Sequence, residues 1–290
     1  MPIVQLTIFY GSFLVFPILI LLIRKYKNTE KKFLTISLII LSLLFIQVRF
    51  VEPYLLNVKE YDLNLIDSED IKIAVFADTH IGVYSSRNFL ERIVNKTNEQ
   101  NPDLILIPGD FVYKMDKVEI AESFESLKNL NAPTFAVLGN HDNGVPGDNV
   151  GVELKKVLED LNIQVIDNHE KEITIKNKKI KITGLEDYWN GVSNNNIKNE
   201  DDRFNILLTH NPDILYNIPE NSSELAVCGH THGGQVRLPF LYKKAIPSEY
   251  GFDRGIYNIR STKLFVTPGT GTVLLPFRFL LLPEISILNL

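Results

Sequence analysis

Two long apolar segments near the N-terminus constrain the fold of this chain more than any other feature. Residues 3–23 contain no charged side chain, and as a helix they would extend over roughly 30 Å, the thickness of a bilayer core. A second apolar run covers residues 33–48 and reaches residue 51 if the Arg49 side chain extends to the membrane surface. We therefore expect a membrane-anchor region over residues 1–51, with two transmembrane helices at about 3–23 and 33–51.

A cleaved signal peptide and a pair of buried helices are the alternatives for these runs. No basic residues precede the first run, and neither run ends in a small-residue cleavage site, so the sequence favours membrane spans. The loop between the runs, RKYKNTEKK, carries five basic residues, whereas the outer flanks carry only Arg49 and Lys59. Because positively charged loops stay in the cytoplasm, we expect a multi-pass protein of the cell membrane whose remaining domain is extracytoplasmic.

The charge of the chain is divided between these two parts. Residues 1–51 carry a net charge of +5, and residues 52–290 carry −10. An acidic body lacks the basic surface that a nucleic-acid backbone requires, so we expect no nucleic-acid binding. The single cysteine, Cys228, excludes an internal disulfide and a cysteine-rich zinc site. No feature of the sequence identifies a protein partner.

Beyond a connector over residues 52–70, short apolar strands alternate with helical segments. Strand-like runs at residues 71–76, 103–107 and 134–138 are followed by segments with helical spacing, the third near residues 152–161. This βαβαβ order predicts an α/β fold with a parallel sheet covered by helices. Further strands are expected in a hairpin over ITIKNKKIKIT that turns at Asn177-Lys178, and at residues 204–208, 224–227, 263–266 and 285–290.

Metal-capable side chains follow five of these strands, at the point where each strand ends. In open α/β sheets the loops at the carboxyl ends of the strands share one edge, where binding sites assemble. Five of the six histidines belong to these loops. The five motifs are Asp78-Thr79-His80, Gly109-Asp110, Gly139-Asn140-His141-Asp142, Thr209-His210 and Gly229-His230-Thr231-His232.

The chemistry of this set points to two divalent metal ions. Carboxylate oxygen, amide oxygen and imidazole nitrogen suit Mn, Fe or Zn better than Ca or Mg, which favour oxygen alone. His230 and His232 can present imidazoles to neighbouring ions, and the Asp110 carboxylate can bridge them. Metals held about 3.5–4 Å apart clamp the attacking and leaving oxygens of a displacement at phosphorus, so a phosphoester is the expected substrate.

The ordered motifs D-x-H, GD, GNHD, H and GHTH resemble the calcineurin-like metallophosphoesterase family. The surrounding phrases PDLILIPGDFV, FAVLGNHDN and CGHTHGGQVRLP are most similar to small bacterial members that carry N-terminal membrane or export segments. The resemblance covers residues 71–290. It implies a four-layer αββα sandwich, preceded here by two transmembrane helices, and the activity of a metal-dependent phosphoric ester hydrolase.

Site roles follow from the resemblance position by position. His141 would contact the phosphoryl oxygen or protonate the leaving group, while a metal-bridging hydroxide attacks phosphorus directly. Asp142 would orient a neighbouring group. One metal would take Asp78, His80, Asp110 and His232, and the second would take Asp110, Asn140, His210 and His230.

Two departures from family patterns narrow the activity. Many relatives carry an acid three residues after the bridging aspartate, where it steadies the motif histidine, but Tyr113 occupies that position here. Either another carboxylate supports His141 or its pKa is less tuned. The GDxxDRG arginines of the phosphoprotein phosphatases are also absent, which argues against a serine/threonine protein phosphatase.

The substrate is suggested by two segments that mix large apolar residues with Lys or Arg, residues 236–244 and 273–283. They could form a lip that dips into the membrane interface, although packing in the core is the interpretation that the sequence favours. We hypothesise a phosphodiester, pyrophosphate or phosphomonoester substrate attached to a lipid or to the cell envelope. Arg254 and Arg278 are candidate phosphate contacts.

Two alternatives remain. In the first, the body faces the cytoplasm and cleaves a nucleotide-linked lipid precursor as a pyrophosphatase. In the second, the protein is a non-catalytic, metal-binding membrane scaffold, which the completeness of the motif set disfavours.

Overall fold

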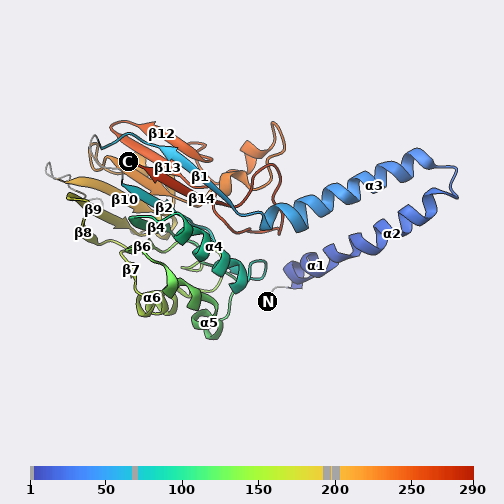
Figure 1. Ribbon diagram of the computed structural model, residues 1–290, viewed down its shortest axis with the longest axis horizontal. Helices are drawn as coiled ribbons and strands as arrows, with labels where there is room; N and C mark the ends of the chain where they lie inside the picture. Colours follow the sequence, from blue (N-terminus) through green and yellow to red (C-terminus); the bar gives the residue numbers. More distant parts are fainter. Residues whose placement is uncertain (1–2, 67–70, 192–196, 198–202) are drawn as a thin grey trace.

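The structure is a computed structural model that describes residues 3–66, 71–191, 197 and 203–290. Figure 1 shows an α/β body with a pair of long helices that extends from one end of it. Those helices correspond to the two apolar segments of the sequence, and the body contains the strands that carry the metal-capable motifs.

The extended pair consists of two helical arms. The first arm comprises α1 (Ile3–Gly11) and α2 (Val15–Tyr26), and the second comprises α3 (Lys32–Ile46) and a π-helical turn (Gln47–Val51). Each arm is long and apolar enough to cross a membrane, and little of either is buried against the rest of the protein. The arms are therefore not core helices of the body, which removes one alternative for the apolar runs.

Arg49 lies at the base of the arms and ties them together. It is fully buried, and its Nε donates a hydrogen bond to Ser12 Oγ at 3.2 Å. Its guanidinium also lies over the rings of Phe9 and Phe50, at 4.7 and 4.6 Å from their centroids. The Arg49 side chain therefore packs inward between the two arms, where these neighbours stabilise the buried cation.

The first six-stranded sheet has the order β1-β14-β2-β4-β6-β7. Strands β2, β4, β6 and β7 run parallel to one another, and β14 runs antiparallel to β2. The three strands predicted from the βαβαβ pattern are confirmed as neighbours in this sheet. Its members are β1 (Asn57–Asp62), β2 (Lys72–Val75), β4 (Leu104–Pro108), β6 (Thr134–Val137), β7 (Ile163–Val165) and β14 (Glu284–Asn289).

Strand β1 lies inside residues 52–70, the segment expected to act as a connector. It is an edge strand that pairs only with β14, in parallel, and its side chains are exposed or half-buried. A strand with so little burial carries no continuous apolar run, so its sequence does not reveal it. Residues 67–70, at the end of that segment, lie outside the described residues.

The second six-stranded sheet has the order β12-β13-β11-β10-β9-β8. The hairpin between β8 and β9 turns at Lys176 and Asn177, whose φ values of 46° and 67° suit a tight hairpin turn, one residue earlier than predicted. The members of this sheet are β8 (Glu170–Ile175), β9 (Lys178–Leu185), β10 (Phe204–Thr209), β11 (Leu225–Cys228), β12 (Gly255–Ile259) and β13 (Thr262–Val266).

The two sheets pack face to face and form the central core of the body. Three helices, α4 (Arg87–Glu99), α5 (Ile120–Phe124) and α6 (Gly151–Asp160), cover the outer face of the first sheet. The outer face of the second sheet packs against 3-10 turns such as Pro212–Tyr216. The α/β fold is therefore confirmed, and within the described residues short turns form its fourth layer.

A small two-stranded sheet lies at the motif-bearing edge. Strands β3 (Ile81–Gly82) and β5 (Val112–Tyr113) pair in parallel directly after two of the motifs. Tyr84, which follows β3, stacks on Phe9 of α1 with ring centroids 6.1 Å apart. The edge that carries the metal-capable residues therefore lies beside the base of the helical arms.

Candidate metal centre

Five of the seven predicted metal ligands have a backbone in the left-handed region. L-residues rarely adopt positive φ, and such strain gathers at functional sites because the surrounding structure must enforce it. These five residues lie in the loops that follow β2, β4 and β11, where the chain turns sharply. The φ values are 52° for Asp78, 44° for His80, 56° for Asp110, 72° for His230 and 49° for His232.

Two glycines allow the motif loops to touch one another. A Cβ atom on Gly139 would clash with the side chain and the backbone of Asp110. A Cβ atom on Gly109 would lie 2.6 Å from the backbone nitrogen of Gly139, and Gly109 itself has a φ of 82°. The glycines of the GD and GNHD motifs are therefore required for the close approach of the loops that follow β4 and β6.

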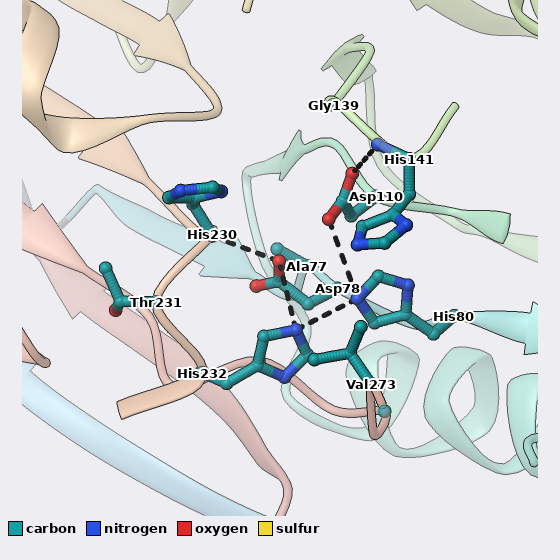
Figure 2. A network of polar contacts seen from close by, with 12 residues as sticks. Ala77, Asp78, His80, Asp110, Gly139, His141, His230, Thr231, His232 and Val273 are labelled. Atoms are coloured by element: carbon teal, nitrogen blue, oxygen red, sulfur yellow. Dashed lines mark hydrogen bonds and ion pairs between the residues drawn. The ribbon is translucent and has the colours of Figure 1, made fainter. Parts of the chain in front are cut away.

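The first group of ligand atoms converges around His80 and His232. Their Nε2 atoms lie 2.9 Å apart, and the His80 Nε2 lies 3.5 Å from Asp110 Oδ2. The His80 Nδ1 donates to the carbonyl oxygen of Val112, so its Nε2 directs a lone pair toward the centre. Asp78 Oδ1 lies 3.8 Å from the His232 Nε2. Figure 2 shows how Asp78, His80, Asp110 and His232 face one another.

The second group converges around Asn140. Its Oδ1 lies 3.1 Å from the His210 Nε2 and 3.0 Å from the His230 Nδ1. The His210 Nδ1 donates to the carbonyl oxygen of Pro108 at 2.7 Å, which turns its Nε2 inward. Asp110 Oδ2 lies 3.2 Å from the same His210 Nε2. This carboxylate oxygen therefore faces both groups.

Electrostatics make the centre receptive to positive charge. Burial lowers the pKa of both His80 and His230 to about 3, so these imidazoles are neutral. Burial also lowers the pKa of His210, but the nearby carboxylates, led by Asp110, outweigh burial and raise it well above its usual value. Burial raises the pKa of Asp78 to about 7.

The donors fit a divalent metal. Asp78 Oδ2 is buried and has no hydrogen-bond partner among the described residues, which is costly for a carboxylate unless a cation faces it. The groups Asp78, His80, His232 and Asp78, Asp110, His210 each bring their ligand atoms within 4.8 Å of one another. Nitrogen and oxygen donors without a thiolate are the set that Mn, Fe or Zn accepts.

His141 lies at the rim of these groups. Its backbone N–H donates to Asp110 Oδ1 at 2.9 Å. Its ring packs between His80, at 5.0 Å, and Tyr113, at 5.4 Å, so an aromatic ring occupies the place where relatives use an acid. Burial lowers its pKa. Together with Lys114, His141 also lines a cavity of about 270 Å³.

Asp142 joins two motif loops. Its Oδ2 accepts a hydrogen bond from the Gly139 N–H at 2.9 Å, and its Oδ1 accepts one from the Val112 N–H at 3.0 Å. It is fully buried, and burial raises its pKa to about 8. The side chain therefore holds the backbone of the GNHD loop against β5.

The two candidate phosphate-binding arginines do not join the centre. The buried Arg278 guanidinium donates to the carbonyl oxygens of Pro268, Gly269 and Gly271, and so braces the loop that packs against Asp78. Arg254 lines a separate cavity at the base of the second arm. The Arg278 guanidinium is thus held by backbone carbonyls, and no hydrogen bond or ion pair joins the Arg254 guanidinium to a ligand residue in the described part of the chain.

Trp189 is a site residue that the sequence does not reveal. Its ring lies 4.4 Å from the His230 ring in an edge-on arrangement, and its backbone N–H donates to Asp187 Oδ2 at 2.8 Å. Burial raises the pKa of Asp187 to about 6. The only local signal is an aspartate two residues before the tryptophan, a common start of a turn, so no motif marks this contact.

The segments 236–244 and 273–283, which we call the lip loops, lie beside the base of the helical arms. Phe277 packs on Phe45 of α3 with ring centroids 5.6 Å apart. Several of their large apolar side chains are exposed, above all Phe240 at 93% and Leu274 at 66%. The expectation that these segments pack in the core is therefore wrong for those side chains.

Comparisons with known proteins agree with the site. Residues 71–234 match the family model for the calcineurin-like phosphoesterases. The uncharacterized metallophosphoesterase YkuE of Bacillus subtilis is 32% identical over 255 residues, which cover 83% of this chain and 88% of YkuE. The phosphodiesterase YaeI of Escherichia coli is 30% identical over 222 residues, or 76% of this chain and 82% of YaeI.

A third relative has a lipid-related name. The UDP-2,3-diacylglucosamine pyrophosphatase LpxG of Chlamydia muridarum is 25% identical over 312 residues, which cover 85% of this chain and 93% of LpxG. The family model covers strands β2 to β11 and all five motif loops. The chain therefore belongs to the calcineurin-like phosphoesterase family and is a metal-dependent hydrolase of phosphoric esters.

Proposed function

We propose that this protein is a membrane-tethered phosphoesterase with a centre of two divalent metal ions, Mn, Fe or Zn. The observation that carries this proposal is the position of Asp110 Oδ2, which lies 3.5 Å from the His80 Nε2 and 3.2 Å from the His210 Nε2. One carboxylate oxygen can thus bridge two ions. Asp78, His80, Asp110 and His232 would hold one metal, and Asp110, Asn140, His210 and His230 would hold the other.

The chain positions its own groups for a displacement at phosphorus. Two bound divalent ions would supply Lewis-acid activation of a water molecule and would neutralise the phosphate charge. His141 lines the neighbouring cavity, where its ring can donate a hydrogen bond or a proton to the leaving-group oxygen. The His80 and Tyr113 rings restrict its orientation. Lys114 adds positive charge to the same cavity, where it favours a phosphate anion.

The test of this proposal is the hydrolysis of bis-p-nitrophenyl phosphate by the full chain in detergent. We expect turnover that requires added Mn²⁺, Zn²⁺ or Fe²⁺ and that a chelator abolishes. Only a bound metal could serve as the Lewis acid at this site, because the ligand side chains cannot. Restoring the metal after chelation should restore the rate. A rate that is unchanged by chelation and by metal addition would contradict the proposal.

The position of the lip loops supports a substrate attached to a lipid or to the cell envelope. They join the base of the helical arms, since the Arg278 N–H donates to the carbonyl oxygen of Val48 at 3.1 Å and Phe277 packs on Phe45. Their exposed apolar side chains suit the interfacial region of a bilayer, with Lys243 and Lys244 at headgroup level. The bond cleaved would be a phosphodiester or pyrophosphate bond, with a phosphomonoester as the alternative.

The body would lie outside the cytoplasm, because the basic residues gather in the loop between the arms. The name of LpxG supports a second candidate function, a cytoplasm-facing pyrophosphatase of a nucleotide-linked lipid precursor. A cysteine introduced at the exposed Lys156, with Cys228 replaced by serine, distinguishes the two. Labelling of intact cells by an impermeant thiol reagent supports the first orientation, and labelling only after lysis supports the second.

A further inference from the structure

A cavity separate from the metal centre lies where the second helical arm joins the body. Its volume is about 290 Å³. Its walls come from the end of the arm, from strand β1 and from the segments around the starts of β12 and β14. No residue that lines it is a predicted metal ligand. The charged lining residues are Glu52, Lys59, Arg254 and Glu284, and Leu280 provides an apolar wall. We propose that this cavity binds the phosphoethanolamine headgroup of a zwitterionic phospholipid.

Lys59 and Arg254 provide the phosphate-binding side of the cavity. Within the described ranges, the hydrogen bonds of Arg254 involve its backbone N–H, to Asp253 Oδ1 and Tyr257 Oη, and its guanidinium has no hydrogen-bond or ion-pair partner. Lys59 is exposed, and its Nζ lies 4.5 Å from the centroid of the Tyr61 ring. A guanidinium presents two parallel donors that match the oxygens of a phosphate diester, and the neighbouring ammonium adds a second positive charge.

Glu52 provides the ammonium-binding side. Its side chain is nine-tenths buried, its Oε2 has no hydrogen-bond partner in the described part of the chain, and its Oε1 lies 3.5 Å from Gln47 Nε2. The other carboxylate is already satisfied, since Glu284 Oε1 accepts from Tyr61 and Ser286, each at 2.8 Å. A buried carboxylate oxygen without a donor is costly, and a primary ammonium with three N–H groups would supply the missing partner.

The location of the cavity favours a lipid as the source of this headgroup. Glu52 lies in the last turn of the second apolar arm, which ends at Tyr54, and the exposed Leu280 flanks the opening. If the arms span the membrane as proposed above, this point is at the level of the headgroups. Two cations balance two carboxylates in the lining, so a zwitterionic lipid fits better than an anionic lipid.

Native mass spectrometry of the full chain in detergent tests this inference. The protein is titrated with dioleoyl phosphatidylethanolamine, with dioleoyl phosphatidylglycerol and with soluble O-phosphoethanolamine. We expect phosphatidylethanolamine to bind about tenfold or more tightly than phosphatidylglycerol, because hydrogen bonds to charged groups carry such factors. Glu52→Gln should remove this preference, and Lys59→Gln and Arg254→Gln should weaken binding of both lipids. The exposed Lys156→Gln on α6 is the matched control and should leave binding unchanged.

The outcomes separate this site from the proposed catalytic function, because none of these binding measurements depends on hydrolysis. Binding of phosphatidylethanolamine that depends on Glu52 and Lys59 supports the headgroup site even if the metal proposal fails. Binding of O-phosphoethanolamine alone would overturn the assignment to a lipid. Equal affinity for the two lipids, with no effect of Glu52→Gln or Lys59→Gln, would overturn the headgroup site itself. Lys59 is exposed, so its variant keeps the test valid if Glu52→Gln fails to fold.

Discussion

The motif loops and the lip loops meet at one edge of the body and differ in almost every physical respect. In the motif loops the polar side chains are buried and several residues have positive φ. The single carboxylate of Asp110 contacts His80, His141 and His210, which belong to three other loops. In the lip loops large apolar side chains such as Phe240 are exposed. Under the proposed function, this difference corresponds to a division of roles, in which the motif loops would determine the reaction and the lip loops would determine how a substrate is presented to it.

The largest effect should follow from Asp110→Asn, which removes the charge shared by both ligand groups. Loss of an outer partner of a metal ligand typically costs about 10- to 100-fold in activity, so loss of the shared carboxylate should cost more than about 100-fold. The measurement is kcat on bis-p-nitrophenyl phosphate at saturating Mn²⁺. Full activity in this variant would contradict the assignment of the reaction to the motif loops.

His141→Ala should lower the rate by about 10²- to 10⁴-fold, the range for removal of a general acid. Metal content should stay at the level of the unmodified protein, because the His141 ring lies at the rim of both ligand groups. Elemental analysis beside the kinetic assay tests both statements. A variant that loses its metals together with its activity would show that His141 is a ligand instead.

A smaller effect is expected from Asp142→Asn. The Asn side chain has one acceptor oxygen, so it can accept from the N–H of Gly139 or from that of Val112, but not from both. An unsatisfied buried donor costs about 1–3 kcal/mol, and misplacement of the GNHD loop should lower kcat by roughly tenfold. Chemical denaturation and the standard assay measure the two effects. An unchanged midpoint of unfolding would contradict the proposed link between these loops.

The smallest effect is expected in the lip loops and depends on the substrate. Phe240→Ser should raise KM about fivefold for a phosphodiester with a long acyl chain in vesicles, as partial immersion of this ring contributes about 1 kcal/mol. Hydrolysis of bis-p-nitrophenyl phosphate should not change. Val152→Ser, at an exposed position on α6, is the matched control. An equal loss on both substrates would mean that the lip loops support the reaction itself.

Residues of the motif loops could be predicted from the sequence, whereas several residues outside them could not. The ligand residues were predictable because each follows an apolar strand, and parallel strands bring their carboxyl ends to one edge. Strand β1 was not, because an edge strand with exposed side chains carries no apolar run. Trp189 reaches His230 through a turn that no periodic pattern marks.

The two arginines show the same limit. Charge alone does not indicate whether a guanidinium faces a substrate, the backbone carbonyls that surround Arg278, or the cavity that Arg254 lines. The exposure of Phe240 likewise depends on how residues 236–244 turn near the base of the arms, which their composition does not specify.

The central claim is that Asp110 joins two metal ions in one centre, and the metal content of the purified chain tests it most directly. Elemental analysis after saturation with Mn²⁺ and removal of free metal should give two ions per chain. Asp110→Asn should hold fewer than two, whereas His141→Ala should still hold two. One ion or none in the unmodified protein, or two ions retained in Asp110→Asn together with full hydrolysis, would contradict the account.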